Sequence, residues 1–160
     1  MIRNFISAGI MMMVLSFLFG CSKSVPIGEI ERFDFSYTRG YMANSNIDYC
    51  VWLEDGKYIA SFKPHGVPEE QALIWEADSA FIERIRQCLR QYKVGHWNGF
   101  NKSGGFVLDG DQFSLVVRFQ DKTAISAIGY MEWPDHYPEF QKEIERLFED
   151  YAKEKSLSEK

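Results

Sequence analysis

Cysteine and histidine are the side chains of this 160-residue chain best suited to chemistry near neutral pH, and there are three of each. A thiol can act as a nucleophile, form a disulfide, bind a metal or accept an acyl chain, and an imidazole can transfer protons or bind a metal. The surrounding sequence decides among these roles. The six residues are Cys21, Cys50, Cys88, His65, His96 and His136.

Cys21 follows a segment with the features of a secretion signal. Arg3 supplies the positive charge near its start, and residues 5–19 form an apolar run interrupted only by small residues. A transmembrane helix is the alternative, but a span needs about 20 predominantly apolar residues, and this run is shorter and ends at the polar residues 20–24. We therefore predict that residues 1–20 are a signal peptide.

The motif Leu18-Phe19-Gly20-Cys21 resembles the bacterial lipobox, whose cysteine becomes the lipidated first residue of the mature protein. The resemblance implies a lipoprotein held in a membrane by three acyl chains on Cys21. A single chain anchors a protein only marginally, so a stable anchor needs several. Ser22, in place of aspartate, is similar to the pattern for transport to the outer membrane. We expect a cell-envelope location there, on either the periplasmic or the surface face.

The other two cysteines would lie in an oxidising compartment, where a disulfide between them is one prediction. The bond would contribute about 4 kcal/mol in the chain-entropy model. However, Cys50 alternates with the apolar face of a predicted strand, whereas Cys88 lies on the apolar stripe of a predicted helix. Two free thiols are therefore the alternative, and the separation of the two Cα atoms decides between them.

The histidines lie in three different loops, and none has a cysteine, aspartate or histidine at a spacing typical of metal ligands. The chain also lacks the Gly-x-Ser-x-Gly motif of a nucleophilic serine. The sequence therefore predicts no catalytic residue, no metal site and no cofactor. An envelope hydrolase remains the alternative, and it requires a loop histidine within about 3 Å of a carboxylate or thiol.

Aromatic residues in loops are the best candidates for ligand binding. Their flat, amphipathic rings can stack on a sugar or a peptide, although in a chain with 16% aromatic residues they can also simply pack at the ends of a sheet. The candidates are Trp97, Phe100, Trp133 and Tyr137. We predict a non-enzymatic module that binds a protein, a peptide or a glycan, with a purely architectural role as a further alternative.

Net charge argues against one class of partner. Without residues 1–20 the chain keeps 17 basic and 23 acidic residues, a net charge of −6. Binding of nucleic acid needs a clustered basic face, and no such cluster is visible in the sequence. We therefore expect no nucleic-acid partner.

Hydrophobic periodicity predicts the elements that position these residues. Period-2 alternation and turn residues predict strands at 30–37, 47–53, 57–62, 106–108, 113–119 and 124–130, with a weaker one at 72–75. Apolar residues at helical spacing predict a helix that starts at Asp78 or Ser79 and ends at Gly95, and another from Pro138 to Tyr151.

The order β-β-β-α-β-β-β-α predicts an α+β fold, with an antiparallel sheet of about five to six strands covered on one face by two helices. A two-sheet sandwich with peripheral helices is the alternative. The predicted organisation is a signal peptide (1–20), an acylated cysteine and tether (21–29), a single domain (30–153) and a polar tail (154–160).

Several short motifs lie in the last part of the chain. They are Gly95-His96-Trp97-Asn98-Gly99-Phe100, Leu108-Asp109-Gly110-Asp111, Leu115-Val116-Val117-Arg118-Phe119, Gly129-Tyr130 and Trp133-Pro134. Together they resemble uncharacterised bacterial envelope lipoproteins with a Trp-rich turn, an Asp-Gly hairpin and a Gly-to-Pro connector before a closing helix. The chain departs from that pattern at Phe113, where a tryptophan is expected. Such proteins have no assigned activity, so the resemblance implies no catalytic residues.

Overall fold

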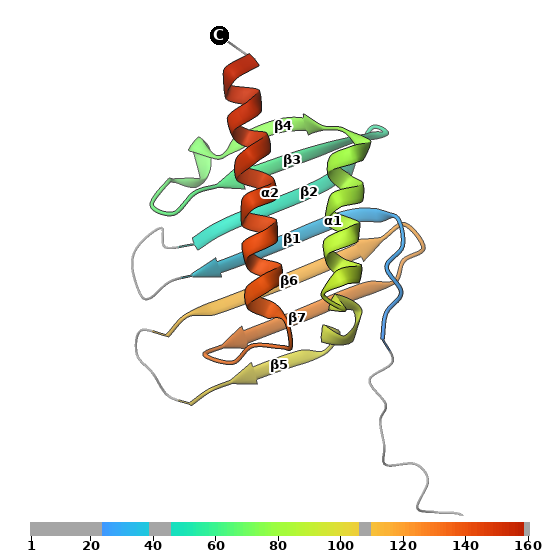
Figure 1. Ribbon diagram of the computed structural model, residues 1–160, viewed down its shortest axis with the longest axis vertical. Helices are drawn as coiled ribbons and strands as arrows, with labels where there is room; N and C mark the ends of the chain where they lie inside the picture. The colour runs from blue at the N-terminus through green and yellow to red at the C-terminus, as the bar shows by residue number, and fades with distance from the viewer. Residues whose placement is uncertain (1–23, 39–45, 106–109, 159–160) are drawn as a thin grey trace, which may run out of the picture.

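The computed structural model describes residues 24–38, 46–105 and 110–158, which form one sheet with two helices across one face (Figure 1). The strands are β1 (Ile30–Thr38), β2 (Asn46–Glu54), β3 (Lys57–Lys63), β4 (Leu73–Ala77), β5 (Phe100–Ser103), β6 (Gln112–Phe119) and β7 (Ala124–Tyr130). The α-helices are α1 (Ser79–Gln91) and α2 (Tyr137–Ser158), and the short 3-10 helices are η1 (Glu69–Gln71) and η2 (Val94–Trp97).

The α+β prediction is confirmed, and the two-sheet alternative is wrong, because the described strands form a single seven-stranded sheet in the order β4-β3-β2-β1-β6-β7-β5. Neighbouring strands are antiparallel except β5, which runs parallel to β7, so the sheet is mixed. The weak strand at 72–75 corresponds to β4. The strand expected at 106–108 lies outside the described residues, and β5 precedes it in the chain.

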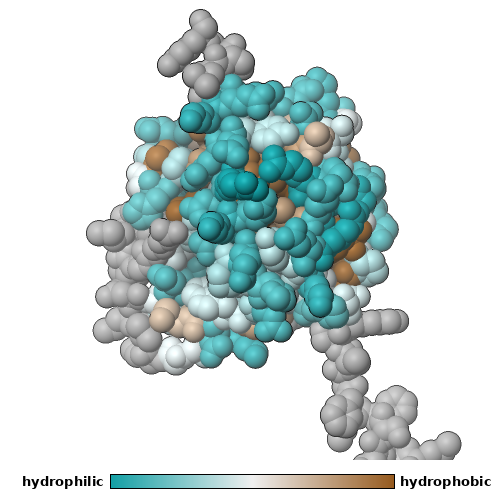
Figure 2. Space-filling view, viewed as in Figure 1, coloured by the Kyte–Doolittle hydropathy of each residue, from teal (hydrophilic) through white to brown (hydrophobic). Residues whose placement is uncertain are grey.

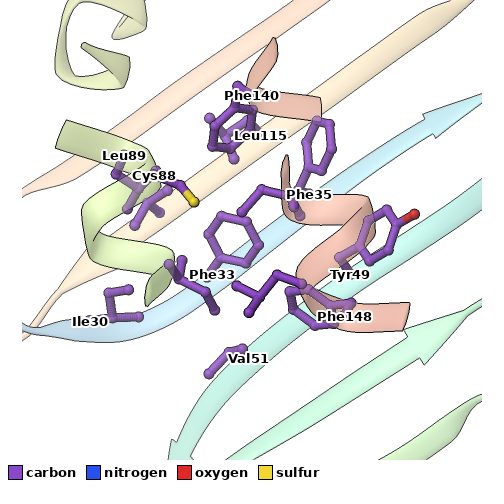
Figure 3. Close-up of a cluster of buried hydrophobic side chains, with 14 of the residues drawn as sticks. Ile30, Phe33, Phe35, Tyr49, Val51, Cys88, Leu89, Leu115, Phe140 and Phe148 are labelled. Atoms are coloured by element: carbon purple, nitrogen blue, oxygen red, sulfur yellow. The ribbon is translucent and has the colours of Figure 1, made fainter. Parts of the chain in front are cut away.

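The core lies between the sheet and the two helices (Figure 3). At its centre, Phe35 on β1 is paired in register with Tyr49 on β2 and with Leu115 on β6. The helices contribute apolar stripes that include Ile85 on α1 and Phe148 on α2, both fully buried. The outer surface over the helices is mostly hydrophilic (Figure 2), as amphipathic helices on a sheet require.

The C-terminal end of each helix differs from the prediction. Asp78 caps α1 as predicted, since its side chain accepts a hydrogen bond from the Phe81 backbone N–H at 2.7 Å. The helix stops earlier than Gly95, however, because Lys93 adopts the left-handed conformation that ends it, with φ of 54°. Helix α2 continues to Ser158, so the predicted polar tail at 154–158 is helical.

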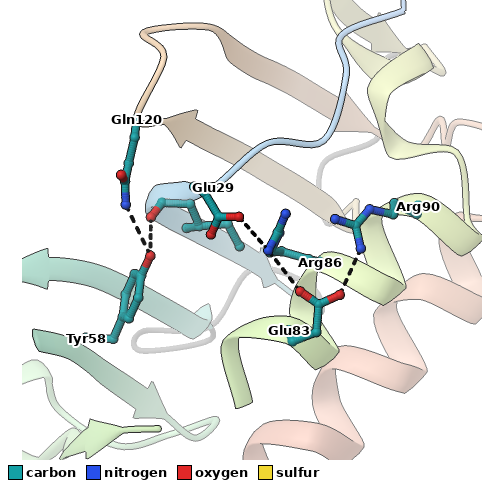
Figure 4. Close-up of polar contacts among 7 residues, drawn as sticks. Glu29, Tyr58, Glu83, Arg86, Arg90 and Gln120 are labelled. Atoms are coloured by element: carbon teal, nitrogen blue, oxygen red, sulfur yellow. Dashed lines mark hydrogen bonds and ion pairs between the residues drawn. The ribbon is translucent and has the colours of Figure 1, made fainter. Parts of the chain in front are cut away.

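Residues 24–29, which we call the N-terminal strap, pack on the domain instead of forming a free tether. The Val25 N–H donates to the Gly95 carbonyl at 3.0 Å, and the Gln120 N–H donates to the Glu29 carbonyl at 2.9 Å. The Arg86 guanidinium joins the Glu29 and Glu83 carboxylates, at 2.8 Å and 2.9 Å (Figure 4). Apolar side chains of the strap also pack against the core. The domain therefore begins before Ile30.

Only glycine fits at position 95, because the strap passes directly over it. A Cβ at this position would collide with the Val25 carbonyl. We expect Gly95→Ala to displace the strap and to lower the free energy of unfolding by about 1–3 kcal/mol, the usual cost of overpacking. Urea denaturation measures the loss, and faster proteolysis within residues 24–29 would report the displaced strap.

Gly28→Ala is the matched control for this substitution. A Cβ at Gly28 would meet its nearest atom, on Phe119, at 3.7 Å, which is an ordinary contact. The control should therefore unfold like the wild type. Equal stability of Gly95→Ala and wild type would show that the strap does not bind this surface.

Candidate functional site

A cleft of about 500 Å³ opens where the end of α1, η2, β5 and the connector between β7 and α2 meet. We call it the Trp133 cleft, after its most exposed aromatic residue. Its walls combine aromatic, cationic and imidazole side chains with a single carboxylate. The lining residues are Tyr92, Lys93, His96, Trp97, Phe100, Lys102, Trp133, Pro134, Asp135 and His136.

The backbone around the cleft is held in unusual conformations. Lys93, Met131 and His136 have φ values of 54°, 53° and 64°, in the left-handed region that non-glycine residues seldom occupy. Close packing keeps the connector on its path, because a Cβ at Gly129 would collide with the Glu132 carbonyl and with a neighbouring ring. Residues in such conformations cluster at binding sites, where surrounding contacts offset the strain.

Two of the four predicted aromatic residues are structural. Trp97 and Tyr137 are only 3% and 4% exposed. The Trp97 indole N–H donates to the Asp135 carbonyl at 3.2 Å, and its ring packs edge-on against Phe140 at 5.1 Å. These two residues therefore join the connector to the core, and of the two only Trp97 lines the cleft.

The other two aromatic residues offer surface to a ligand. Trp133 is 37% exposed, and Phe100 is half-buried. The Trp133 ring stacks on Tyr137 with centroids 4.9 Å apart and an interplanar angle of 15°. Since Tyr137 is itself held in the core, the exposed indole has a fixed orientation. Trp133 also lines a neighbouring hollow of about 250 Å³ beside the start of α2, so it stands between two concave surfaces.

The charged residues of the cleft were not predicted from the sequence. Lys93 follows α1 and Lys102 lies on β5, with its ammonium 5.4 Å from the centre of the Phe100 ring. Asp135 is the carboxylate among the lining residues. The cleft therefore carries more positive than negative charge, although the whole chain has a net charge of −5.

Two of the three histidines, His96 and His136, line the cleft together with Asp135, whereas His65 is exposed in the loop after β3. Within the described ranges, no ion pair joins a histidine to a carboxylate. No group of three or more potential metal ligands occurs in that part of the chain either. The contact that a histidine-dependent hydrolase requires is thus not formed there.

Both described cysteines are free thiols. Cys50 lies on the sheet face opposite the helices, and Cys88 points from α1 into the core (Figure 3). Burial raises the pKa of the Cys50 thiol to about 12, with a further contribution from Asp34, and burial raises the pKa of the Cys88 thiol to about 11. Both thiols are therefore protonated at neutral pH, and neither is suited to nucleophilic catalysis.

No protein-family model, no characterised protein and no solved structure matches this chain. Among the described residues, no helix is both long enough and apolar enough to cross a membrane. The geometry and charge of the Trp133 cleft are therefore the basis for a functional proposal.

Proposed function

We propose that this protein is a lipid-anchored binding module of the bacterial cell envelope, acylated at Cys21 in the outer membrane, which holds a ligand in the Trp133 cleft without chemical turnover. The observation that carries the proposal is the exposed, rigidly stacked Trp133 ring at the mouth of a concave site. Ligand sites are typically concave, with aromatic walls and a few polar groups. A glycan, a peptide or a protein loop fits such a surface.

The path of the strap supports a link between the anchor and the cleft. Val25 is hydrogen-bonded to Gly95, which directly precedes the cleft residues His96 and Trp97. The described chain accordingly begins on the side of the sheet where β5 is the edge strand, far from the C-terminal end of α2 (Figure 1). A fully extended chain covers at most about 3.6 Å per residue, so Cys21 lies within about 14 Å of Val25. Lipid on Cys21 would then hold the cleft close to the membrane.

A hydrolase is the second candidate, because His96, His136 and Asp135 line the same cleft. Catalytic hydrogen bonds are often long in a ligand-free enzyme and tighten on substrate binding. Appearance of cleavage products during incubation with a bound ligand, and their loss in His96→Ala or His136→Ala, would favour the hydrolase over the binding module.

Removal of the Trp133 ring tests the binding proposal directly. We expect Trp133→Ala to weaken binding of glycan or peptide ligands at least about tenfold, because an exposed aromatic anchor typically contributes about 1.4 kcal/mol or more to the binding free energy. The free energy of unfolding should fall less than for a core tryptophan, since the ring is 37% exposed, and the variant is tested under conditions in which it is folded. Binding of the purified lipoprotein to immobilised glycan and peptide arrays, followed by titration of each hit, provides the measurement.

Trp52→Ala is the matched control. Trp52 is half-buried on the opposite face of the sheet, where its N–H donates to Glu54 at 3.3 Å. The control removes an indole of the same size from a surface outside the cleft and should retain full binding. Equal binding by Trp133→Ala and wild type would remove the cleft from the proposed function. Trp97→Ala is unsuitable for this purpose, because Trp97 belongs to the core.

A further inference from the structure

Resting on the proposed function, we infer that the ligand of the Trp133 cleft is an acidic saccharide. The ring of the saccharide lies on Trp133, and its carboxylate or phosphate group faces Lys93 and Lys102. Three features of the cleft carry this inference: its lysines, its aromatic surface and its polar rim.

Neither lysine of the cleft forms an ion pair with a described carboxylate. Three lysines elsewhere do form ion pairs: Lys57 with Glu76 at 2.8 Å, Lys63 with Asp48 at 2.8 Å and Lys122 with Glu31 at 2.9 Å. Lys93 and Lys102 are exposed, and neither has an ion pair within the described residues. Lys93 lies between α1 and η2, whereas Lys102 lies on β5, so an anion in the cleft can approach both from different sides. In an acidic protein, such a site attracts anions that the rest of the surface repels.

The aromatic surface favours a ring with an apolar face. The position of Trp133 is fixed by Tyr137, so its exposed area is preorganised, and little entropy is lost when a flat group stacks on it. Half-buried Phe100 adds a second ring to the cleft lining, and the Lys102 ammonium lies over that ring. A pyranose has an apolar C–H face that matches such a surface.

The polar rim matches the hydroxyl groups of a sugar. The exposed residues His96, Asp135 and His136 line the same cleft as the rings. Imidazoles can donate and accept hydrogen bonds, and a carboxylate accepts them. One ligand class therefore satisfies the whole lining, because an acidic saccharide combines an apolar face, hydroxyl edges and an anionic group.

The acidic saccharide could be a soluble glycan or the headgroup of a glycolipid in the anchoring membrane. The strap places the cleft near the predicted lipid anchor, so both sources lie within reach. The same sugar, offered either in solution or on a vesicle surface, distinguishes the two sources.

The test compares three soluble probes: a glucuronic acid oligosaccharide, a glucose oligosaccharide of equal length and glucose 6-phosphate. The full lipoprotein in detergent is titrated with each probe by calorimetry. We expect at least one acidic probe to bind about tenfold or more tightly than the neutral one, with affinity that falls as salt rises. Lys93→Gln and Lys102→Gln should each weaken acidic binding about three- to tenfold, and should weaken binding of the neutral probe by a smaller factor.

Lys57→Gln is the control, because it removes one exposed lysine outside the cleft and should not alter binding. The vesicle arm uses the reconstituted lipoprotein with neutral vesicles that carry either a glucuronosyl or a glucosyl lipid. Tighter binding to the glucuronosyl surface than to the soluble acid would assign the ligand to the membrane, and the reverse would assign it to a soluble glycan.

Failure of this inference can be told from failure of the proposed function. If acidic and neutral sugars bind alike and Trp133→Ala weakens both, the cleft binds ligand but the acidic specificity is wrong. If no acidic probe binds, or if neither lysine variant changes acidic binding, the inference is overturned. The proposed function is overturned separately, by binding of any array ligand that is indifferent to Trp133→Ala.

Discussion

Replacing Phe148 with alanine is expected to lower the free energy of unfolding by about 3–5 kcal/mol, the usual cost of deleting a buried phenylalanine ring. Phe148 lies on α2 and is fully buried. Its ring contacts those of Phe81 on α1 and Tyr49 on β2 at centroid distances of 5.0 Å and 5.1 Å, and Trp75 on β4 at 6.0 Å. One side chain thus joins both helices to the sheet. The expected loss is large, because the total free energy of unfolding of a whole domain is only about 5–15 kcal/mol.

Phe148→Leu is the control for this prediction. Leucine keeps most of the buried volume, so we expect a loss nearer 1 kcal/mol. Urea denaturation followed by tryptophan fluorescence measures both variants, and Trp75 reports directly on the cluster. A loss below about 1 kcal/mol for Phe148→Ala would contradict the packing of α2 on the sheet, since an unrelaxed cavity of that size costs more.

Periodicity predicted the central strands because they are half-buried. On β1, for example, Phe33 and Phe35 point into the core and Asp34 points to the other face, so burial leaves an alternating pattern in the sequence. Strand β5 left no such pattern. It has four residues, lies at the edge of the sheet and contains one apolar residue, Phe100. Its pairing with β7 depends on tertiary contacts that the local sequence does not encode.

The accessible part of the site was predicted only in part, for a similar reason. Trp97 at the end of η2 and Trp133 in the connector look alike in the sequence, yet Trp97 is buried and Trp133 is exposed. Lys93 and Lys102 could not be singled out, because nothing local distinguishes a cleft lysine from any other exposed lysine. The left-handed conformation of Lys93 was not predicted, because Gly95, which follows it closely, already matches the usual signal for the end of a helix.

The strap shows how an irregular segment can still be ordered. Residues 24–29 have no apolar period, which favours a flexible tether. Their order instead comes from backbone hydrogen bonds to Gly95 and Gln120 and from the ion pair of Glu29 with Arg86. Such partners are distant in sequence, so composition alone does not reveal them. In the proposed function, this order of the strap is what would keep a lipid anchor on Cys21 close to the cleft.

Substitution of Cys21 by serine is expected to abolish acylation completely, because a hydroxyl cannot replace the thiol that the lipobox resemblance assigns to the lipid. The wild-type N-terminal peptide should begin at Cys21 and carry the mass of three acyl chains, which together hold the protein in a membrane far more firmly than one chain could. Mass spectrometry of the native polypeptide measures both properties. Cys50→Ser is the matched control and should retain full acylation, since its half-buried thiol lies on the sheet. A wild-type chain with Met1 intact and no fatty acid would contradict the anchor, and with it the proximity of the Trp133 cleft to the membrane.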